Sequence, residues 1–190
     1  MMEKNSKRKI LLDLAVSLDG FIEAKIGEID WCIMEDYMNF SDFLGRIDTI
    51  LFGRKSFEAW LSYKPGDNDS DEDISMWKTI VCKEKYVFSK TLTDPYDQVT
   101  YIRDRIPEEI RRIKNASGRD IWLYGGSDLI TTFMNQGLID ELRLSVHPVI
   151  LGEGKPLFID IRERVQLKLI EVKSFSSGVV QLIYHFRKTE

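Results

Sequence analysis

The sequence predicts an α/β protein in which helices flank one central mixed sheet. Three observations support this fold class: short β-rich runs recur along the chain, helical patterns separate the early runs, and the last runs follow one another directly. Strands that alternate with helices favour a largely parallel sheet covered on both faces. The last two strands are joined by a short polar turn, which favours an antiparallel hairpin at one side of the sheet.

Eight short runs carry the strand pattern of aliphatic, β-branched and aromatic residues. They are residues 10–16, 49–52, 85–89, 99–102, 121–124, 141–149, 167–173 and 179–186. The turn Ser176-Ser177-Gly178 joins the last two. Pro148 lies inside the run 141–149, and a proline within a strand indicates an edge strand or a bulge. His147 beside it is interpreted as a structural or dimer-surface residue.

Five segments between these runs carry helical patterns. They are residues 37–44, 56–61, 74–81, 107–114 and 128–135. Pro107 suits a first helical turn, where its missing N–H costs nothing, and Gly137 follows the fifth segment as a helix end requires. Residues 64–73, KPGDNDSDED, hold five acids in ten positions and predict an acidic surface loop. A lid near the functional site is the alternative.

Size and composition indicate one domain that spans residues 1–190, with residues 1–8 expected to be flexible. A chain of 190 residues that is 43% hydrophobic can bury one core, and no linker or repeat divides it. The net charge of −4, with charges of both signs, argues against a general nucleic-acid binder. The two cysteines suggest neither a zinc site nor a disulfide framework.

The chain contains no segment expected to enter or cross a membrane. No run reaches the roughly 18 apolar residues that span a bilayer. The basic N-terminal stretch precedes an apolar run that Asp13 interrupts, and no small-residue cleavage site follows. We therefore expect a cytoplasmic protein.

Gly125 and Gly126 directly follow the apolar run 121–124 and precede a helical pattern, with Ser127 next to them. Two residues without Cβ atoms let an outside group approach the backbone, and the unpaired N–H groups at a helix start attract anions. A tight turn is the alternative interpretation of the same pattern. The segment becomes a candidate phosphate site when it is combined with the rest of the chain.

Similar chemistry follows two other apolar runs. Gly53-Arg54-Lys55-Ser56 follows the apolar run that ends at Phe52. Ser89-Lys90-Thr91 follows the apolar run that ends at Phe88. Ligands of open α/β sheets bind at the carboxyl ends of the strands. A guanidinium, an ammonium, hydroxyls and backbone N–H groups on adjacent loops suit a ligand with several phosphates, such as a dinucleotide. The spacing fits neither a Walker loop nor the GxGxxG fingerprint.

Six segments together resemble the dihydrofolate reductase-like superfamily. They are SLDGFIE at 17–23, DW at 30–31, DTILFGRKSFE at 48–58, YVFSK at 86–90, LYGGSDLITTFMNQGLIDELRL at 123–144 and HPVILGEGKPLF at 147–158. Within it they are most similar to the reductase domain of the bifunctional deaminase-reductase of riboflavin biosynthesis and to its stand-alone relatives. The resemblance extends from about residue 9 to residue 186. The zinc motifs HxE and PCxxC of the deaminase half are absent from the sequence.

The resemblance implies a three-layer dihydrofolate reductase-like fold and an NADPH-dependent oxidoreductase that forms a homodimer. It implies hydride transfer to a pyrimidine-, pterin- or flavin-related small molecule, as in 5-amino-6-(5-phosphoribosylamino)uracil reductase. By motif, Ala15 and Ile22 would adjoin the nicotinamide. The loops would hold the phosphates: Gly53, Arg54, Lys55 and Ser56 near them, Arg54 with Ser89 and Lys90 at the 2′-phosphate, and Gly125, Gly126 and Ser127 at the pyrophosphate.

Two acids bear on these assignments. Dihydrofolate reductases often carry an arginine where this chain has Asp128, an anion beside the expected phosphates, so NADH is an alternative to NADPH. Asp128 also suits the first turn of a helix, where the dipole favours negative charge. Asp36 lies five positions after Trp31, the spacing of the pterin-binding carboxylate of dihydrofolate reductase, which implies a proton donor beside a substrate-pocket tryptophan. A plain acid at the start of helix 37–44 is the alternative for Asp36.

The resulting prediction is an NADPH-dependent reductase. Dihydrofolate reductase activity proper is one alternative. A dinucleotide-binding module that reduces nothing is a second, and a non-redox protein whose function is its dimer surface is a third.

Overall fold

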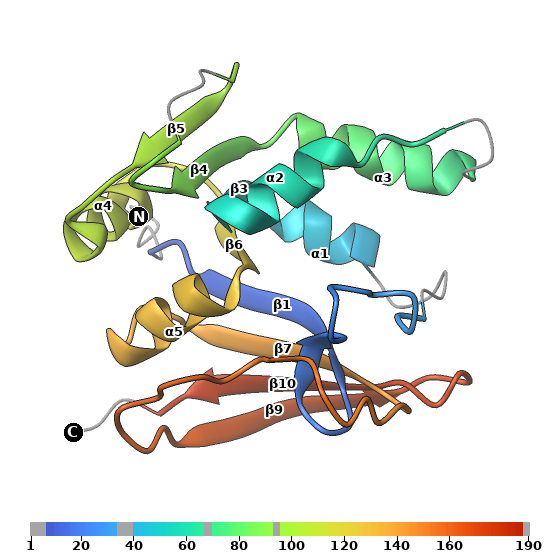
Figure 1. The fold of residues 1–190 in the computed structure, drawn as a ribbon. Coiled ribbons are helices and arrows are strands. Elements are labelled where there is room, and N and C mark those ends of the chain that lie inside the picture. The colour runs from blue at the N-terminus through green and yellow to red at the C-terminus, as the bar shows by residue number, and fades with distance from the viewer. Residues whose placement is uncertain (1–6, 34–39, 67–69, 93–95, 188–190) are drawn as a thin grey trace, which may run out of the picture.

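A computed structural model describes residues 7–33, 40–66, 70–92 and 96–187, and it contains a sheet of eight strands (Figure 1). The order across the sheet is β5-β4-β3-β6-β1-β7-β10-β9. The strands are β1 (Ile10–Ser17), β3 (Ile47–Gly53), β4 (Glu84–Phe88), β5 (Val99–Ile102), β6 (Asp120–Gly125), β7 (Glu141–His147), β9 (Leu167–Ser174) and β10 (Val180–Phe186).

Every pairing from β5 to β7 is parallel, whereas β10 runs antiparallel to β7 and to β9. The mixed sheet of eight strands and its C-terminal hairpin are thus confirmed. β9 forms one edge of the sheet, and its Leu169, Ile170 and Val172 are exposed.

Five helices cover the sheet in two layers (Figure 1). They are α1 (Phe40–Arg46), α2 (Arg54–Ser62), α3 (Asp71–Val81), α4 (Ile106–Asn115) and α5 (Ser127–Asn135). Helices α4 and α5 bury apolar residues against one face of the sheet, and α1, α2 and α3 pack on the other. Pro107 lies in the first turn of α4, as its fixed φ angle favours.

The central strands are apolar on both faces because helices cover both. In β1, Ile10, Leu12 and Val16 belong to the core beneath α4 and α5, while Leu11 belongs to the core beneath α1 and α2. Alternation along a strand sends successive side chains to opposite faces. Burying one such side chain stabilises the fold by about 1.5–3 kcal/mol.

The acidic segment 64–73 is not a loop throughout. Helix α3 begins at Asp71, and Ser70 caps it: the Asp73 backbone N–H donates to Ser70 Oγ at 3.1 Å, and the Ser70 backbone N–H donates to the Asp73 carboxylate at 3.3 Å. The acids at 71–73 therefore occupy the first turn of a helix, where the helix dipole favours negative charge. The prediction of a loop was wrong for residues 71–73 because a run of acids is typical of a solvated loop as well as of the first turn of a helix.

Two other expectations, those for Pro148 and for Arg8, need correction. Strand β7 ends at His147, so Pro148 terminates a central strand and indicates neither an edge nor a bulge. Helix α1 is described from Phe40 onward, and the start of the expected helix lies outside the described residues. Arg8, within the stretch expected to be flexible, is buried. A small second sheet of β2 (Phe21–Glu23) and β8 (Lys155–Pro156) was not expected.

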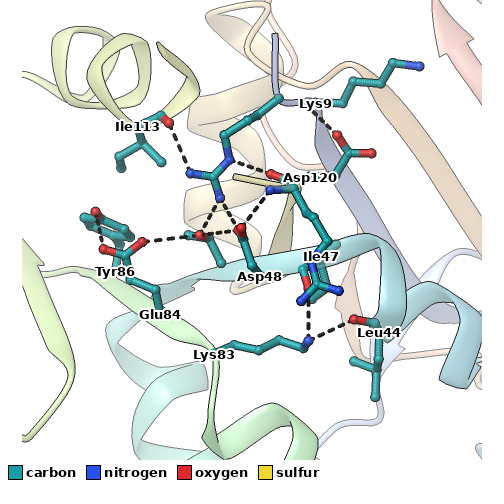
Figure 2. A network of polar contacts seen from close by, with 12 residues as sticks. Lys9, Leu44, Ile47, Asp48, Lys83, Glu84, Tyr86, Ile113 and Asp120 are labelled. Carbon is teal, nitrogen blue, oxygen red and sulfur yellow. Dashed lines mark hydrogen bonds and ion pairs between the residues drawn. The ribbon is translucent and has the colours of Figure 1, made fainter. Parts of the chain in front are cut away.

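Arg8 belongs to a polar cluster at the amino ends of the strands. Figure 2 labels Asp48, Lys83 and Ile113 of this cluster. Its guanidinium donates to the carboxylate of Asp48, to Thr49 Oγ1 at 2.5 Å and to the backbone carbonyl of Ile113 at 3.3 Å. Lys83 Nζ donates to two backbone carbonyls nearby, those of Leu44 and Ile47. These contacts fasten β1, β3 and α4 to one another, at the edge opposite to the carboxyl ends of the strands.

Within the part of the chain that the structure describes, no helix has the length and apolar character that crossing a bilayer demands.

Candidate functional site

The loops after β3 and β6 meet at the carboxyl edge of the sheet. A Cβ atom on Gly53 would lie 3.2 Å from the Gly125 carbonyl oxygen, and one on Gly126 would lie 3.2 Å from Ser56 Oγ. Gly125 and Gly126 have φ angles of 134° and 95°, which other residues rarely adopt. The close approach and the backbone conformation both require glycine here, and the result is a cradle of bare backbone.

Ser127 begins helix α5 and is the first functional side chain in this cradle. Its side chain is 2% exposed, and its Oγ atom has no hydrogen-bond partner among the described residues. Gly126 at the N-cap supplies no side chain to satisfy the N–H groups of the first turn. A buried hydroxyl without a partner costs free energy, so such a group often marks a place that a ligand completes.

Helix α2 starts at the same edge with three of the predicted residues. Arg54 donates through Nη1 to both carboxylate oxygens of Glu58 at 2.9 Å, one helical turn later. Lys55 is exposed, and Ser56 faces Gly126 across the cradle. The N-cap Gly53 again provides no side-chain cap. Two uncapped helix starts therefore converge on one place, and such starts attract anions.

Ser89 lies at the end of β4, which is adjacent to β3. Its Oγ atom accepts hydrogen bonds from the backbone N–H groups of Thr91 and Leu92 at 3.2 and 3.0 Å. The hydroxyl thus shapes its own loop, while the neighbouring Lys90 is exposed. The structure brings all three predicted loops to one edge, in the order β4, β3, β6.

Asp128, the acid that left NADH open as a cofactor, is exposed in the first turn of α5. Its neighbour Ser127 is buried instead. An exposed acid at a helix start interacts favourably with the dipole, which is the structural interpretation proposed for it from sequence.

Trp31 and His147 mark a second part of the site, on the face of the sheet that also carries α1. Their rings meet edge to face with centroids 5.4 Å apart. The backbone N–H of Ile33 donates to His147 Nδ1 at 3.2 Å, which requires a neutral ring at that nitrogen. Burial lowers the pKa of His147, in agreement with the structural role expected for it. Segment 31–33 is thereby fixed over the end of β7.

The two residues expected beside the nicotinamide lie near the end of β1 but face different sides. Ile22, in β2, packs against the core that includes Val16. Ala15 precedes Val16 in β1, so strand alternation directs it to the opposite face. Asp36, the expected proton donor, lies outside the described residues.

Asp19 is a structural residue in the turn between β1 and β2. Its carboxylate accepts the backbone N–H groups of Leu151 and Gly152 at 3.2 and 2.8 Å and the hydroxyl of Ser17 at 2.7 Å. The hydrogen bond from Ser17, with those from the two backbone groups, lowers the pKa of Asp19. Asp19 thus joins the β1–β2 turn to the loop after β7, a contact between distant segments that no local spacing reveals. Gly20, which follows Asp19 in this turn, has a positive φ angle of 89°.

The cradle fits the diphosphate of a dinucleotide. Gly53 and Gly126 leave the backbone bare where an added Cβ atom would press on the facing loop, Ser127 offers an unpaired hydroxyl, and two helix starts supply N–H groups. Anions bind such helix starts through backbone N–H groups and the helix dipole. Across the described ranges, no group of three or more His, Cys, Asp or Glu side chains is arranged to hold a metal.

The strand order and the antiparallel C-terminal hairpin agree with the dihydrofolate reductase-like fold expected from the sequence, and solved structures share this fold. Residues 8–181 match the RibD C-terminal domain, and the chain belongs to this family. Two relatives come from Bacillus subtilis (strain 168). Uncharacterized protein YyaP is 56% identical over 98% of this chain and 99% of its own length, and uncharacterized protein YwjB is 34% identical over 94% and 98%.

Solved structures share the fold. A putative riboflavin biosynthesis protein from Shewanella sp. PV-4 has a TM-score of 0.79 at 23% identity, over 95% of this chain and 99% of its own. A pyrimidine reductase-like protein from Corynebacterium diphtheriae has a TM-score of 0.68 at 14% identity, over 96% and 93%. The diaminohydroxyphosphoribosylaminopyrimidine deaminase/5-amino-6-(5-phosphoribosylamino)uracil reductase from Thermotoga maritima has a TM-score of 0.70 at 18% identity, over 95% of this chain and 57% of its own.

Proposed function

We propose that this protein is an NADPH-dependent reductase that transfers hydride to a pyrimidine-, pterin- or flavin-related small molecule. Membership of the RibD C-terminal domain family supports a reductase of the riboflavin-pathway type. The observation that carries the proposal is the buried, unpaired hydroxyl of Ser127 in the glycine cradle. It is a polar group placed for a ligand at the point where two helix starts converge.

Different residues would bind different parts of NADPH. Gly53, Gly125 and Gly126 let the diphosphate approach the backbone, and Ser127 Oγ donates a hydrogen bond to it. Arg54 carries a fixed guanidinium toward the 2′-phosphate that distinguishes NADPH from NADH. NADPH, when bound, supplies the hydride, and the protein contributes binding and orientation.

A Ser127→Ala variant tests the cofactor site. The wild-type protein is expected to bind NADPH, and the variant to bind it at least about tenfold more weakly, since a hydrogen bond to a charged group contributes about 1.5–3 kcal/mol. The control is Ser62→Ala at the other end of α2, whose hydroxyl contacts only the backbone carbonyl of Ala59 among the described residues. NADPH at 100 times its Kd should stabilise the wild type by about 2.7 kcal/mol.

The outcome separates the proposed function from its alternatives. Absence of dinucleotide binding by the wild type would favour a non-redox protein and reject the proposal. Binding without oxidation of NADPH in the presence of 5-amino-6-(5-phosphoribosylamino)uracil or dihydrofolate would favour a non-catalytic binding module. Turnover of dihydrofolate alone would identify a dihydrofolate reductase.

We also propose that the protein forms a homodimer through the β9 edge. Leu169, Ile170 and Val172 are exposed there in a strand with one free edge, and exposed apolar residues on an edge strand favour association. Light scattering after size-exclusion chromatography should give a dimer for the wild type and a monomer for Val172→Lys. A monomeric wild type would reject this assembly.

A further inference from the structure

Three residues form a row across β1, β7 and β10. Ala15 pairs with Ser145, and Ser145 pairs with Gln181. Gln181 Nε2 donates to Ser145 Oγ at 3.4 Å, so these side chains share one face of the sheet. Neighbouring strands lie about 4.8 Å apart, which places Gln181 roughly 10 Å from Ala15. We call Ala15, Ser145 and Gln181 the polar row.

The polar row is deepest at Gln181. Gln181 is 4% exposed and Ser145 is 8% exposed, whereas Ala15 is partly open to solvent. The Oε1 atom of Gln181 has no hydrogen-bond partner within the described part of the chain. An unpaired buried amide oxygen destabilises the fold, and an apolar side chain of similar size would avoid this cost. Stability alone therefore does not account for a glutamine at this position.

The side chains on both sides of the row already have partners. Asp13 and Arg143 lie two residues before Ala15 and Ser145 in β1 and β7, and they form a buried ion pair at 2.7 Å. Burial raises the pKa of Asp13, while Arg143 opposes that rise. His147, one step forward along β7, accepts the N–H of Ile33. The unpaired oxygen of Gln181 stands apart from these satisfied neighbours.

We propose that Gln181 recognises the acceptor substrate by pairing with the lactam edge of a pyrimidine or pteridine ring. This inference rests on the proposed function and names the group of the same site that selects the substrate. Gln181 Oε1 accepts N3–H, the ring N–H that lies between the two ring carbonyls, and the Nε2 hydrogen not directed at Ser145 donates to one of the adjacent carbonyls. A primary amide reads the edge of adenine with the same pair of hydrogen bonds.

The location of the row fits this role. Ala15 is the residue that the family resemblance places beside the nicotinamide, so a ring held at Gln181 has its reducible end directed toward the cofactor. Trp31 packs on His147, which lies two residues, or roughly 7 Å, along β7 from Ser145 on the same face. The indole therefore provides an apolar wall beside the row.

The test compares two uracil probes on the wild-type protein and on Gln181→Met, each saturated with NADPH. The probes are 5,6-diaminouracil and its 3-methyl derivative, in which a methyl group replaces N3–H, the N–H between the two ring carbonyls, and N1–H is retained. The wild type should bind the unmethylated probe about tenfold more tightly, a factor that corresponds to about 1.4 kcal/mol. Gln181→Met should bind both probes equally and weakly. Gln166→Met, which changes an exposed glutamine, should behave as the wild type does.

Two further measurements separate recognition from a structural role. The Kd for NADPH should be the same in all three proteins, and the melting temperature of ligand-free Gln181→Met should equal or exceed that of the wild type because the unpaired oxygen is gone. In turnover, loss of substrate binding alone raises KM and leaves kcat unchanged.

Each outcome decides the inference. The inference would be overturned if the wild type and Gln181→Met bound the unmethylated probe equally. It would also be overturned if the wild type bound both probes with the same affinity. In either case, NADPH binding by the wild type would still support the proposed function. A wild-type protein that fails to bind NADPH overturns both. The preference of the wild type for the unmethylated probe is measured without any substitution, so the inference can fail even if Gln181→Met does not fold.

Discussion

Gly126 and Ser56 are in contact across the loops that follow β6 and β3: a Cβ atom on Gly126 would lie 3.2 Å from Ser56 Oγ. Both residues sit at the start of a helix, so the contact joins the N-termini of α5 and α2. The bare backbone at Gly126 is therefore both a packing requirement and the floor of the proposed diphosphate site. The two roles can be tested separately by measuring the stability and the NADPH affinity of glycine variants.

Gly126→Ala should lower both stability and NADPH binding. A φ angle of 95° is strained for alanine, which costs on the order of 1–3 kcal/mol, and the new methyl group also presses on Ser56. Gly137→Ala is the matched control because it has a φ angle of 60° and nothing within 4 Å of the added Cβ. Urea unfolding should show a loss in both variants, and fluorescence titration should show weaker NADPH binding only in Gly126→Ala. Equal NADPH affinities in the two would argue against the cradle.

Arg54→Ala should reduce the preference for NADPH over NADH. The guanidinium is held by Glu58 in a fixed orientation, and the loss of its contact with a 2′-phosphate should weaken NADPH binding roughly tenfold, about 1.4 kcal/mol. NADH lacks that phosphate, so its Kd should not change. Titrations of both cofactors provide the measurement, with Arg111→Ala in α4 as a control that also removes an arginine paired along its helix. An unchanged ratio of the two affinities would remove Arg54 from the site.

Arg8→Ala should destabilise the fold without affecting the cofactor. Arg8 is buried in contact with Asp48, Thr49 and Ile113, and removal of one partner of a buried ion pair costs about 3–5 kcal/mol. We expect the lower end of that range, since part of Asp48 reaches solvent. Arg119→Ala removes an exposed arginine of the same cluster and should cost far less. Chemical denaturation of both variants tests this, and a loss in Arg8→Ala no larger than in Arg119→Ala would contradict it.

His147 should make the protein less stable as the pH falls below about 6.5. Burial lowers the pKa of His147 in the folded state below its ordinary value of 6.5, so the unfolded chain binds the proton more readily. The stability contributed by neutral His147 is therefore complete above that value and is lost as the pH falls toward the folded pKa. The proton would also displace the N–H of Ile33 from Nδ1.

The measurement is the free energy of unfolding across this pH range for the wild type, His147→Gln and His185→Gln. The chain has two histidines, so the comparison assigns the effect to one of them. His147→Gln should flatten the profile, whereas His185→Gln should retain the fall. A profile that keeps its slope in His147→Gln would show that another group is responsible.

The sequence by itself determined most of the sheet and the chemistry of its edge. Apolar runs such as 121–124 and the glycines after them are local features, because strand burial and positive φ angles depend on the residues that are present at those positions. The three candidate phosphate loops were found in this way, and the structure places their strands side by side.

Only the tertiary structure decided which distant groups act together. Asp19 binds the backbone of Leu151 and Gly152, and Gln181 lies beside Ser145 with one oxygen unpaired, although nothing near either residue in sequence indicates a partner. The sequence around Arg8 likewise predicts a flexible basic segment, whereas in the structure Arg8 contacts β3 and α4. The physical reason is that strand order and register set these contacts, and register depends on the packing of the whole sheet.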